Sequence, residues 1–465
     1  MDAKKVMTSK SLANLMASPR PDSQPVAIAQ ADIVSWSRFY HDVSQLTQQL
    51  TSSKHQRWAI CFDDSYYFAV AFMAAAHARR HLILPGNHQP AALAELSTHF
   101  DAVLHDGVFQ HNFDKAAFKL PASSAAEITN STRFSPLPLS DIRLTLFTSG
   151  SSGTPKAIEK TLDLLDAEIA QLETTWGELL SDSIVASTVS HQHIYGLLFR
   201  VLWPLCAGRR FERFDLIYPE QVMAHASQNS TLISSPALLK RLTDDQATTA
   251  YRAIFSSGGP LPPSAAQQSL QLFEQLPFEV FGSTETGGIG YRQQREPATP
   301  WQRFSSIEMA LNAEGCLRLR SPFVDPQSWY QTSDQCELLA DDQFILKGRA
   351  DRVVKIEEKR ISLTEVERRL CQLEWIEEAA VFPLQETNRL ILAAVITLSE
   401  QGHATLSEMG KGKFWLTLRQ ELRLWLEPVG IPRRYRVVDE IPLNTQGKRL
   451  IRDLELLFKQ QSKDI

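Results

Sequence analysis

The sequence has few cysteines and no long apolar run. Its five cysteines are scattered over 465 residues without a CxxC spacing, which predicts buried thiols in a reducing compartment and no disulfide framework. The longest apolar stretches, around Tyr66–Ala76 and Leu197–Ala207, are too short or too interrupted to span a bilayer. The N-terminal region has no apolar core of the length that a signal peptide needs. We therefore expect a soluble cytoplasmic protein without a transmembrane segment.

An excess of positive charge is also missing. The formal net charge is -5 and the isoelectric point is near 6.2, so bulk charge gives no reason to expect a nucleic-acid partner. The chain is 43% hydrophobic over its 465 residues. That composition supports a large core, and the length favours more than one domain.

Two common nucleotide-binding motifs are absent. GxGxxG occurs nowhere, so a dinucleotide-binding fold lacks its fingerprint. The glycine-rich stretch that is present has the spacing Gly150-x-x-Gly153-x-x-Lys156, which does not match the Walker pattern GxxxxGK[ST]. This spacing disfavours a Walker-type ATPase.

Short β-rich runs alternate with longer helical patterns through the first three quarters of the chain. "RWAICF", "HLILPGN", "STLISS" and "FEVFGSTE" are typical of buried strands, and the alternation predicts an α/β fold with mainly parallel sheets covered by helices. Residues 110–141 are rich in Ser, Pro and Ala and predict an irregular connection. After about Lys347 a charged hairpin, an amphipathic helix, the strand "RLILAAVITL" and a second amphipathic helix predict a compact α+β domain.

The stretch "TSGSSGTPK" follows an apolar run and is suited to holding phosphate. Its two glycines allow the backbone to approach a ligand closely, and successive main-chain N–H groups there can form an anion-binding nest. Hydroxyl donors and the ammonium of Lys156 suit a polyphosphate. Taken alone, the stretch fits a flexible Ser/Gly connection equally well.

Together with its preceding residue, "FTSGSSGTPK" closely resembles the phosphate loop of the AMP-forming adenylating enzymes. These include acyl-CoA synthetases, aryl-CoA ligases, nonribosomal adenylation domains and firefly luciferase. Four further segments resemble the family in its order, and the likeness extends from about Trp36 to Leu456. It implies a large N-terminal domain, residues 1–348, that binds ATP and the acid. A small mobile C-terminal domain, residues 349–465, would swing about a hinge near Asp351.

The resemblance also implies a nucleotide site. In "EVFGSTETGG", Phe281 would stack on adenine, Thr284 would contact the α-phosphate and Glu285 would help to hold Mg²⁺. In "YQTSDQCELLADDQFILKGRADRVVK", Asp334 would accept hydrogen bonds from both ribose hydroxyls, and Arg349 would reach ribose or phosphate. The residues implied for ATP or AMP are Thr148, Ser149, Gly150, Ser151, Ser152, Gly153, Thr154, Lys156, Gly258, Gly259, Phe281, Gly282, Ser283, Asp334, Arg349 and Lys355.

Two more segments carry the implied acid pocket and catalysis. "VSHQHIYGLLF" places His193 at the family's histidine, although His191 and His193 also fit two ordinary histidines near a strand end. The residues implied for the acid pocket are His193, Tyr195, Gly196 and Gly258. In "IPLNTQGKRLIRDLE", Lys448 matches the lysine that enters the site for the first half-reaction. The implied catalytic residues are therefore Lys448, Thr284 and His193.

The function that the resemblance implies has two steps. ATP and a carboxylic acid would form an acyl-adenylate, and a pantetheine thiol of CoA would then accept the acyl group. The segments expected to line the acid pocket show no obvious Asp to hold an amino group, which favours a fatty or aryl acid. Glu358 and Ser333 stand where the family usually has glycine, and Glu358 lies in the hairpin beside the pantetheine passage. Two alternatives therefore stay open: transfer to an acyl carrier protein, and a nucleotide-binding relative that no longer catalyses.

Overall fold

The computed structural model describes residues 9–30, 32–86, 88–107, 115–120, 133–149, 155–242, 249–296, 298–356, 359–386, 389–426, 428–444 and 449–459. The side chains of Ser149, Asp351, Val353, Lys355, Lys359 and Arg360 also lie outside the description. The chain divides into two compact units. Unit 1 contains the described residues before Gly150 together with those of Pro155–Glu308 and Arg320–Tyr330. Unit 2 contains Met309–Leu319 and the described residues from Gln331 onward.

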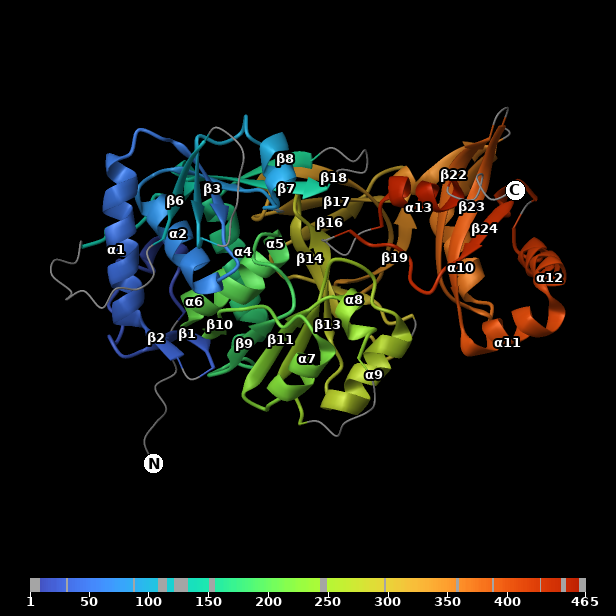
Figure 1. The fold of residues 1–465 in the computed structure, drawn as a ribbon, viewed down its shortest axis with the longest axis horizontal. Coiled ribbons are helices and arrows are strands. Elements are labelled where there is room, and N and C mark those ends of the chain that lie inside the picture. Colours follow the sequence, from blue (N-terminus) through green and yellow to red (C-terminus); the bar gives the residue numbers. More distant parts are fainter. Residues whose placement is uncertain are drawn as a thin grey trace. The chain divides into compact units, whose positions relative to one another are not determined.

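One sheet of unit 1 is built mainly from parallel strands (Figure 1). The strands of this sheet that lie wholly in unit 1 have the order β2 (Asp32–Ser35), β1 (Pro25–Ala29), β10 (Phe211–Glu212), β9 (Ile184–Ser187), β11 (Ser230–Ser234), β12 (Ala253–Ser256), β13 (Phe278–Ser283), β14 (Gly287–Gln293) and β15 (Trp301–Arg303). The strands from β1 to β13 in this order are parallel, whereas β2, β14 and β15 pair antiparallel with their neighbours. The predicted parallel α/β arrangement is therefore confirmed.

The second sheet of unit 1 contains the two strands on either side of the predicted phosphate loop. Its order is β6 (Ala116–Lys119), β5 (Ala102–His105), β3 (Arg57–Cys61), β4 (His81–Leu84), β7 (Arg143–Ser149) and β8 (Pro155–Thr161). All neighbours are parallel except β7 and β8, which form an antiparallel pair. The stretch predicted as an irregular connection contains β6, because four of its residues extend the sheet beside β5.

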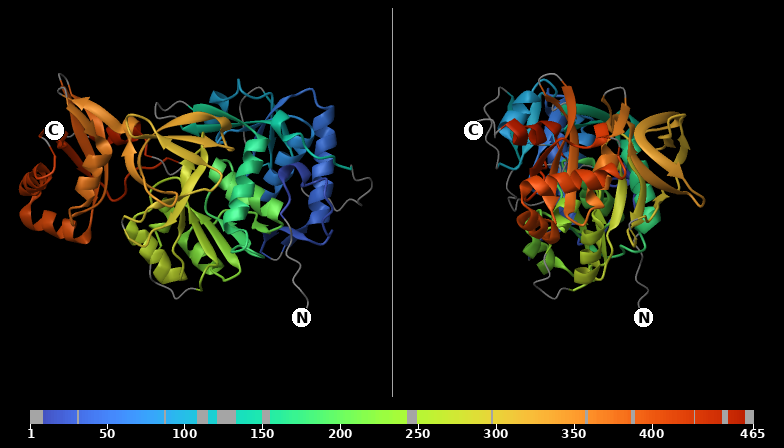
Figure 2. Two further views of the ribbon diagram at one scale, coloured as in Figure 1. Left: turned by 180° about the vertical axis from the view of Figure 1, so that it is seen from behind. Right: turned by 90° about the vertical axis from the view of Figure 1, so that its right-hand side faces the viewer.

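Helices pack on both sheets of unit 1, and α2 and α3 lie against the second sheet. The helices of this unit are α1 (Trp36–Ser52), α2 (Ser65–His77), α3 (Pro90–Glu95), α4 (Leu162–Trp176), α5 (Ile194–Gly196), α6 (Trp203–Ala207), α7 (Pro219–His225), α8 (Pro236–Leu239) and α9 (Pro263–Phe273), with a π-helical turn at Leu197–Leu202. Leu232 and Ile254 pack with α7, α8 and α9, whereas the next residue, Phe255, packs against Trp176 of α4. This alternation follows from the period of two in a strand, and Figures 1 and 2 show the sheet from its two sides.

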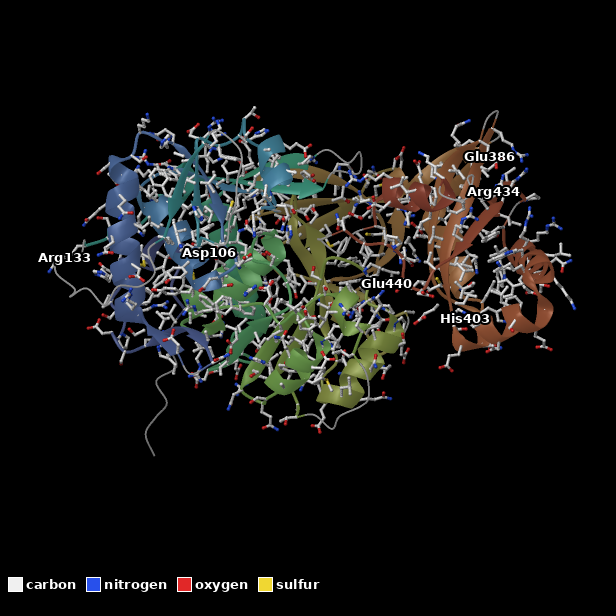
Figure 3. All side chains as sticks on the ribbon, in the orientation of Figure 1. Asp106, Arg133, Glu386, His403, Arg434 and Glu440 are labelled. Atoms are coloured by element: carbon white, nitrogen blue, oxygen red, sulfur yellow. The ribbon has the colours of Figure 1, made fainter. Side chains whose placement is uncertain are left out.

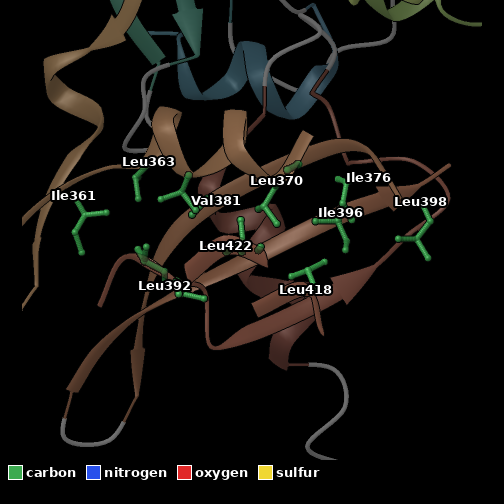
Figure 4. Close-up of a cluster of buried hydrophobic side chains, with 14 of the residues drawn as sticks. Ile361, Leu363, Leu370, Ile376, Val381, Leu392, Ile396, Leu398, Leu418 and Leu422 are labelled. Atoms are coloured by element: carbon green, nitrogen blue, oxygen red, sulfur yellow. The ribbon is translucent and has the colours of Figure 1, made fainter. Parts of the chain in front are cut away.

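Unit 2 has its own core (Figure 4). Leucines of α10 (Leu363–Cys371) and α12 (Lys411–Arg423) pack on one face of β22 (Ile376–Glu386) and β23 (Arg389–Leu398). β24 (Arg434–Val437) pairs with β23, and an ion pair of 3.0 Å joins Arg434 to Glu386 (Figure 3). Its remaining helices are α11 (Glu400–Met409), which the sequence patterns did not predict, and α13 (Ile451–Lys459). β20 (Val353–Ile356) and β21 (Lys359–Ser362) form the predicted hairpin.

Three strands contain residues of both units: β16 (Glu308–Leu311), β17 (Cys316–Ser321) and β18 (Asp325–Leu338). β18 pairs antiparallel with β19 (Gln343–Arg349).

Four of the five cysteines are buried thiols, and Cys371 on α10 is exposed. Among the helices that the structure describes, none has the length and apolar character to cross a membrane.

Asp101 ties the start of β3 to the start of β5. Its carboxylate accepts hydrogen bonds from the main-chain N–H groups of Gln56 and Arg57 and from the Arg57 guanidinium, at 2.7–3.1 Å. These bonds, chiefly that of the Arg57 side chain, lower the pKa of Asp101 to about 2. The negative charge therefore stabilises the fold above the ordinary carboxyl pKa near 4, and this stabilisation is lost as the pH falls toward 2.

We expect Asp101→Asn to lower the free energy of unfolding by about 1–2 kcal/mol at pH 7, since charged hydrogen bonds count but the site is partly exposed to solvent. Denaturant titrations at pH 7 and pH 3 measure the difference, which should shrink at the lower pH. Asp141→Asn is the control, because Asp141 is exposed and lies 3.9 Å from its partner Arg79. An equal loss of stability at both pH values would contradict the charge assignment.

Candidate functional site

The predicted site segments of unit 1 follow three strands at one edge of the first sheet. The histidine segment follows β9, the Gly258–Gly259 turn follows β12, and Thr284 and Glu285 follow β13. β11 lies between β9 and β12, and these four strands are parallel neighbours. Their carboxyl ends therefore meet at the same edge, which is where open α/β sheets place their ligands.

The segment after β9 distinguishes the two histidines. His191 is buried, its Nε2 lies 2.9 Å from the carbonyl oxygen of Phe62 and its Nδ1 lies 3.0 Å from the hydroxyl of Ser65. Since a carbonyl only accepts, Nε2 carries the proton and Nδ1 accepts from the hydroxyl. Burial, aided by the charge of Arg200, lowers the pKa of His191 well below its ordinary value. His191 is therefore a neutral core residue, which supports the choice of His193 as the site histidine.

His193 precedes the short helix α5, which contains Tyr195 and Gly196. A Cβ at position 196 would lie 2.1 Å from the carbonyl oxygen of Ser190, so the chain needs glycine there. The Tyr195 ring contacts Phe199 at a centroid distance of 4.9 Å, and burial raises the pKa of its hydroxyl well above the ordinary value. Tyr195 is therefore a neutral, partly apolar side chain at this edge.

The two glycines in the turn after β12 have free space around the position of a side chain. Gly258 has φ +94°, which favours glycine, and no atom lies within 4 Å of a Cβ built at Gly258 or Gly259. The hydroxyl of Ser257 donates a 2.8 Å hydrogen bond to the carbonyl oxygen of Val280 and so ties this turn to β13. Bare backbone is thus available at positions 258 and 259 for a flat ligand.

The turn from β13 to β14 presents Thr284 and Glu285 at its tip. The N–H of Ser283 donates to the hydroxyl of Thr286 at 3.0 Å, and the N–H of Thr286 donates to the hydroxyl of Ser283 at 3.1 Å. These reciprocal bonds close the turn on itself. Earlier in β13, the Phe281 ring lies 5.6 Å from the Trp301 ring, and Gly282 lies against the backbone of Gly287.

An ion pair joins the β7–β8 pair of strands to this turn. Thr148 and Lys156 are register partners in β7 and β8, on either side of the glycine-rich stretch. The ammonium of Lys156 lies 2.9 Å from Oε1 of Glu285, and this hydrogen bond raises the pKa of Lys156. Burial acts to raise the pKa of Glu285, but the hydrogen bond from Lys156 and other local bonds bring it below the ordinary value. The pair is therefore fully charged at neutral pH.

The side chains at this turn suit Mg²⁺ better than a metal ion that is coordinated entirely by protein ligands. In the described part of the chain, no three His, Cys, Asp or Glu side chains are grouped to hold a metal. Glu285 instead offers one hard carboxylate whose side chain is 27% exposed. Mg²⁺ is commonly held by one or two carboxylates together with water and substrate phosphates. The residues at the turn are compatible with that mode.

Unit 2 contains the predicted ribose residues. Asp334 in β18 and Arg349 at the end of β19 are register partners, and Nη1 of Arg349 lies 3.2 Å from Oδ1 of Asp334. Asp351 lies in a short 3-10 helix and Lys355 lies in β20. The predicted residues outside the description are Gly150, Ser151, Ser152, Gly153, Thr154 and Lys448.

Sequence reasoning missed two charged residues beneath the Thr284–Glu285 turn. Lys160 in β8 and Glu168 in α4 are each 5% exposed. The burial of Lys160 could have been inferred from strand periodicity, because Lys160 lies on the same buried face of β8 as Ile158. Glu168 lies on the buried side of α4, where a carboxylate needs partners that the sequence alone does not reveal.

The sequence profile of the AMP-binding enzyme family matches residues 17–314. This chain belongs to the AMP-binding enzyme family. It is 24% identical over 310 residues to a 4-coumarate–CoA ligase of Cereibacter sphaeroides, an alignment covering 66% of this chain and 70% of that one. It is 22% identical over 472 residues to a D-alanine–D-alanyl carrier protein ligase of Lactococcus lactis, covering 89% of this chain and 92% of that one.

Solved structures of this fold confirm the architecture. ATP-bound MatB from Rhodopseudomonas palustris superposes with a TM-score of 0.78 at 16% identity, covering 98% of this chain and 100% of that one. O-succinylbenzoate coenzyme A synthetase from Bacillus subtilis, in complex with AMP, gives a TM-score of 0.75 at 16% identity, with 98% and 99% covered. At this identity the likeness concerns the fold.

The family and fold class predicted from the sequence are thus confirmed. The chain is an AMP-forming ligase-family enzyme whose chemistry is the activation of an acid as its adenylate. The roles of individual site residues, the boundary at residues 348 and 349, the cytoplasmic location and the thiol acceptor stay predictions.

Proposed function

We propose that this AMP-binding enzyme activates a fatty or aryl acid with ATP and transfers the acyl group to the pantetheine thiol of CoA. The observation that carries the proposal is the 2.9 Å ion pair between Lys156 and Glu285. It joins the β7–β8 pair of strands to the turn that follows β13, although the two residues are 129 positions apart. A cation and a carboxylate at the mouth of a glycine-rich hairpin suit a polyphosphate and its magnesium ion.

The first step forms one bond and breaks one. A carboxylate oxygen of the acid attacks the α-phosphorus of ATP, and the bond from that phosphorus to the bridging oxygen breaks, so that pyrophosphate leaves with the electron pair. Lys156 and Lys448 are suited to stabilise the phosphate charge, and Thr284 to orient the α-phosphate. When bound, Mg²⁺ supplies further charge neutralisation, with Glu285 as its protein ligand. The protein's own work is positioning and electrostatics.

The second step replaces the mixed anhydride of the acyl-adenylate by a thioester. The pantetheine sulfur attacks the acyl carbon, the thiol proton passes to solvent, and AMP leaves with the electrons of the carbon–oxygen bond. We propose that the small domain turns about Asp351 between the two steps, which would withdraw Lys448 and present the β20–β21 hairpin. The predicted boundary between residues 348 and 349 would separate the large domain from the small domain that turns.

The first experiment is carboxylate-dependent exchange of pyrophosphate into ATP across fatty, aryl and amino acids. Exchange with one class would establish the first half-reaction and name the acid. The absence of exchange with every acid, while ATP still binds, would contradict catalysis and favour a nucleotide-binding relative that no longer catalyses. Lys448, Glu285, Thr284 and Asp334 weigh against that relative, because each is the residue type that the chemistry needs.

A second acceptor has its own support. The alignment with the carrier protein ligase covers 89% of this chain, against 66% for the coumarate–CoA ligase. Supplying CoA and a purified carrier protein side by side, and measuring AMP release with each, decides between the two acceptors.

We expect Asp334→Asn to weaken ATP binding about 10–100-fold, because the amide loses charge and can accept fewer hydrogen bonds from the ribose. Discrimination between ATP and 2′-deoxy-ATP should shrink in the same variant. Calorimetric titration with both nucleotides measures the two effects.

Glu337→Gln is the matched control for Asp334→Asn. It also breaks an ion pair between β18 and β19, in which Glu337 lies 2.6 Å from Lys347, but Glu337 is half exposed. Its nucleotide affinity should stay at the wild-type value. A wild-type preference for the ribose in Asp334→Asn would remove Asp334 from the nucleotide site.

A further inference from the structure

Two buried charges lie beneath the turn that presents Glu285. Lys160 and Glu168 are each 5% exposed, and they come from β8 and α4 of the same unit. Burial lowers the pKa of Lys160 and raises that of Glu168, while each charge acts on the other in the opposite direction. Two buried charges of opposite sign are weak evidence for stability, because desolvation offsets their attraction. The contacts that each of them makes with the main chain therefore need another explanation.

Lys160 forms hydrogen bonds with the main chain on the buried side of the turn. Its ammonium donates to the carbonyl oxygen of Glu285 at 3.2 Å and to that of Phe323 at 2.9 Å. An apolar side chain at position 160 could fill the same space between β8 and the turn, but it would leave both carbonyls without this donor. The ammonium thus fixes the peptide unit that bears the Glu285 side chain.

Glu168 holds the other end of the turn. Its Oε1 accepts a hydrogen bond of 2.7 Å from the N–H of Gly288. A Cβ at Gly287 would lie 2.7 Å from Oε2 of Glu168, so the carboxylate fills the space that a side chain there would need. Hydrogen bonds therefore hold the turn at two points: Lys160 binds the carbonyl oxygen of Glu285, and Glu168 binds the N–H of Gly288.

We propose that Lys160 and Glu168 are positioning residues that hold Glu285 in place for magnesium-bound ATP. This inference rests on the proposed function of Glu285. Lys156 pairs with the carboxylate from the solvent side, whereas Lys160 and Glu168 fix the main chain behind it. Neither touches the reacting atoms. Lys160 and Glu168 would affect magnesium binding only by positioning the carboxylate of Glu285.

The test compares ATP binding with and without Mg²⁺ in Lys160→Met. Calorimetric titration of the purified chain gives both affinities without any turnover. Residues that support a metal ligand commonly change metal affinity about 10–100-fold, so we expect the gain in ATP affinity caused by Mg²⁺ to fall by about that factor. ATP affinity without Mg²⁺ should change much less.

Arg209→Met is the matched control. Arg209 is also a buried cation that donates to two main-chain carbonyls, those of Leu180 and Gly177, and it pairs with the carboxylate of Glu173. Its loss should lower the melting temperature and leave the Mg²⁺ effect unchanged. If Lys160→Met and Arg209→Met lower the melting temperature alike and both keep the wild-type Mg²⁺ effect, Lys160 is only structural and the proposal fails.

A double variant covers the case in which Lys160→Met does not fold. Lys160→Met with Glu168→Gln removes both buried charges, and the Gln oxygen can still accept from the N–H of Gly288. We expect this variant to fold and to lose the Mg²⁺ effect; a folded double variant with the full effect would overturn the proposal. Wild-type pyrophosphate exchange tests the proposed function separately, because ATP binding is measurable even in a protein that activates no acid.

Discussion

Lys448→Ala is expected to slow pyrophosphate exchange by about 10²–10³, the usual loss when one group that stabilises transition-state charge is removed. The second step should be preserved, since the resemblance places this lysine in the site only while the adenylate forms. Thioester formation from a chemically prepared acyl-adenylate measures that step alone. The two rates together separate a half-reaction role from a general one.

Lys459→Ala provides the control for Lys448→Ala. Lys459 is an exposed lysine of the same unit, in α13, and lies 3.7 Å from Glu455. Its removal should leave both rates unchanged. Equal losses of both half-reactions in Lys448→Ala would contradict a role confined to adenylation.

Glu285→Gln should reduce exchange by about 10²–10³ because it removes the one carboxylate offered to Mg²⁺ at the turn. The fold should survive, since the lost ion pair with Lys156 is exposed and such pairs contribute about 0–1 kcal/mol. Raising the Mg²⁺ concentration should restore part of the rate. Exchange rates over a magnesium titration, with melting temperatures beside them, measure these effects.

Glu159→Gln is the companion control. Glu159 is an exposed carboxylate of β8 that pairs with Arg143 at 2.7 Å. The variant should keep the wild-type magnesium dependence. A Glu285→Gln enzyme with an unchanged dependence would instead indicate that Glu285 serves only to pair with Lys156.

Much of the fold was open to prediction because local patterns decided it. The runs around β3, β11 and β12 are buried on both faces, as strands between helices must be, and their apolar character shows in the sequence. β6 was missed because its four residues, Ala116–Lys119, become a strand only by pairing with β5. α11 was missed because its sequence, with one buried residue, shows no clear apolar stripe.

From the sequence, candidate site residues could be named only where a motif contains them. The glycine-rich stretch, the Thr284–Glu285 turn and the Asp334–Arg349 region each stand in a segment that resembles the family. Lys160 and Glu168 stand in no such segment. Their hydrogen-bond partners lie at positions 285, 288 and 323, which no local pattern connects to them.

By itself, the sequence determined the family, the class of chemistry and the alternation of strands with helices, because motifs and hydrophobic periodicity are local properties. Only the tertiary structure decided which charges meet. Lys156 reaches Glu285 across 129 positions, and Lys160 becomes a buried cation instead of a solvated one. The physical reason is that the two sheets and α4 bring distant segments together, and desolvation then makes each buried charge depend on the partners that the fold supplies.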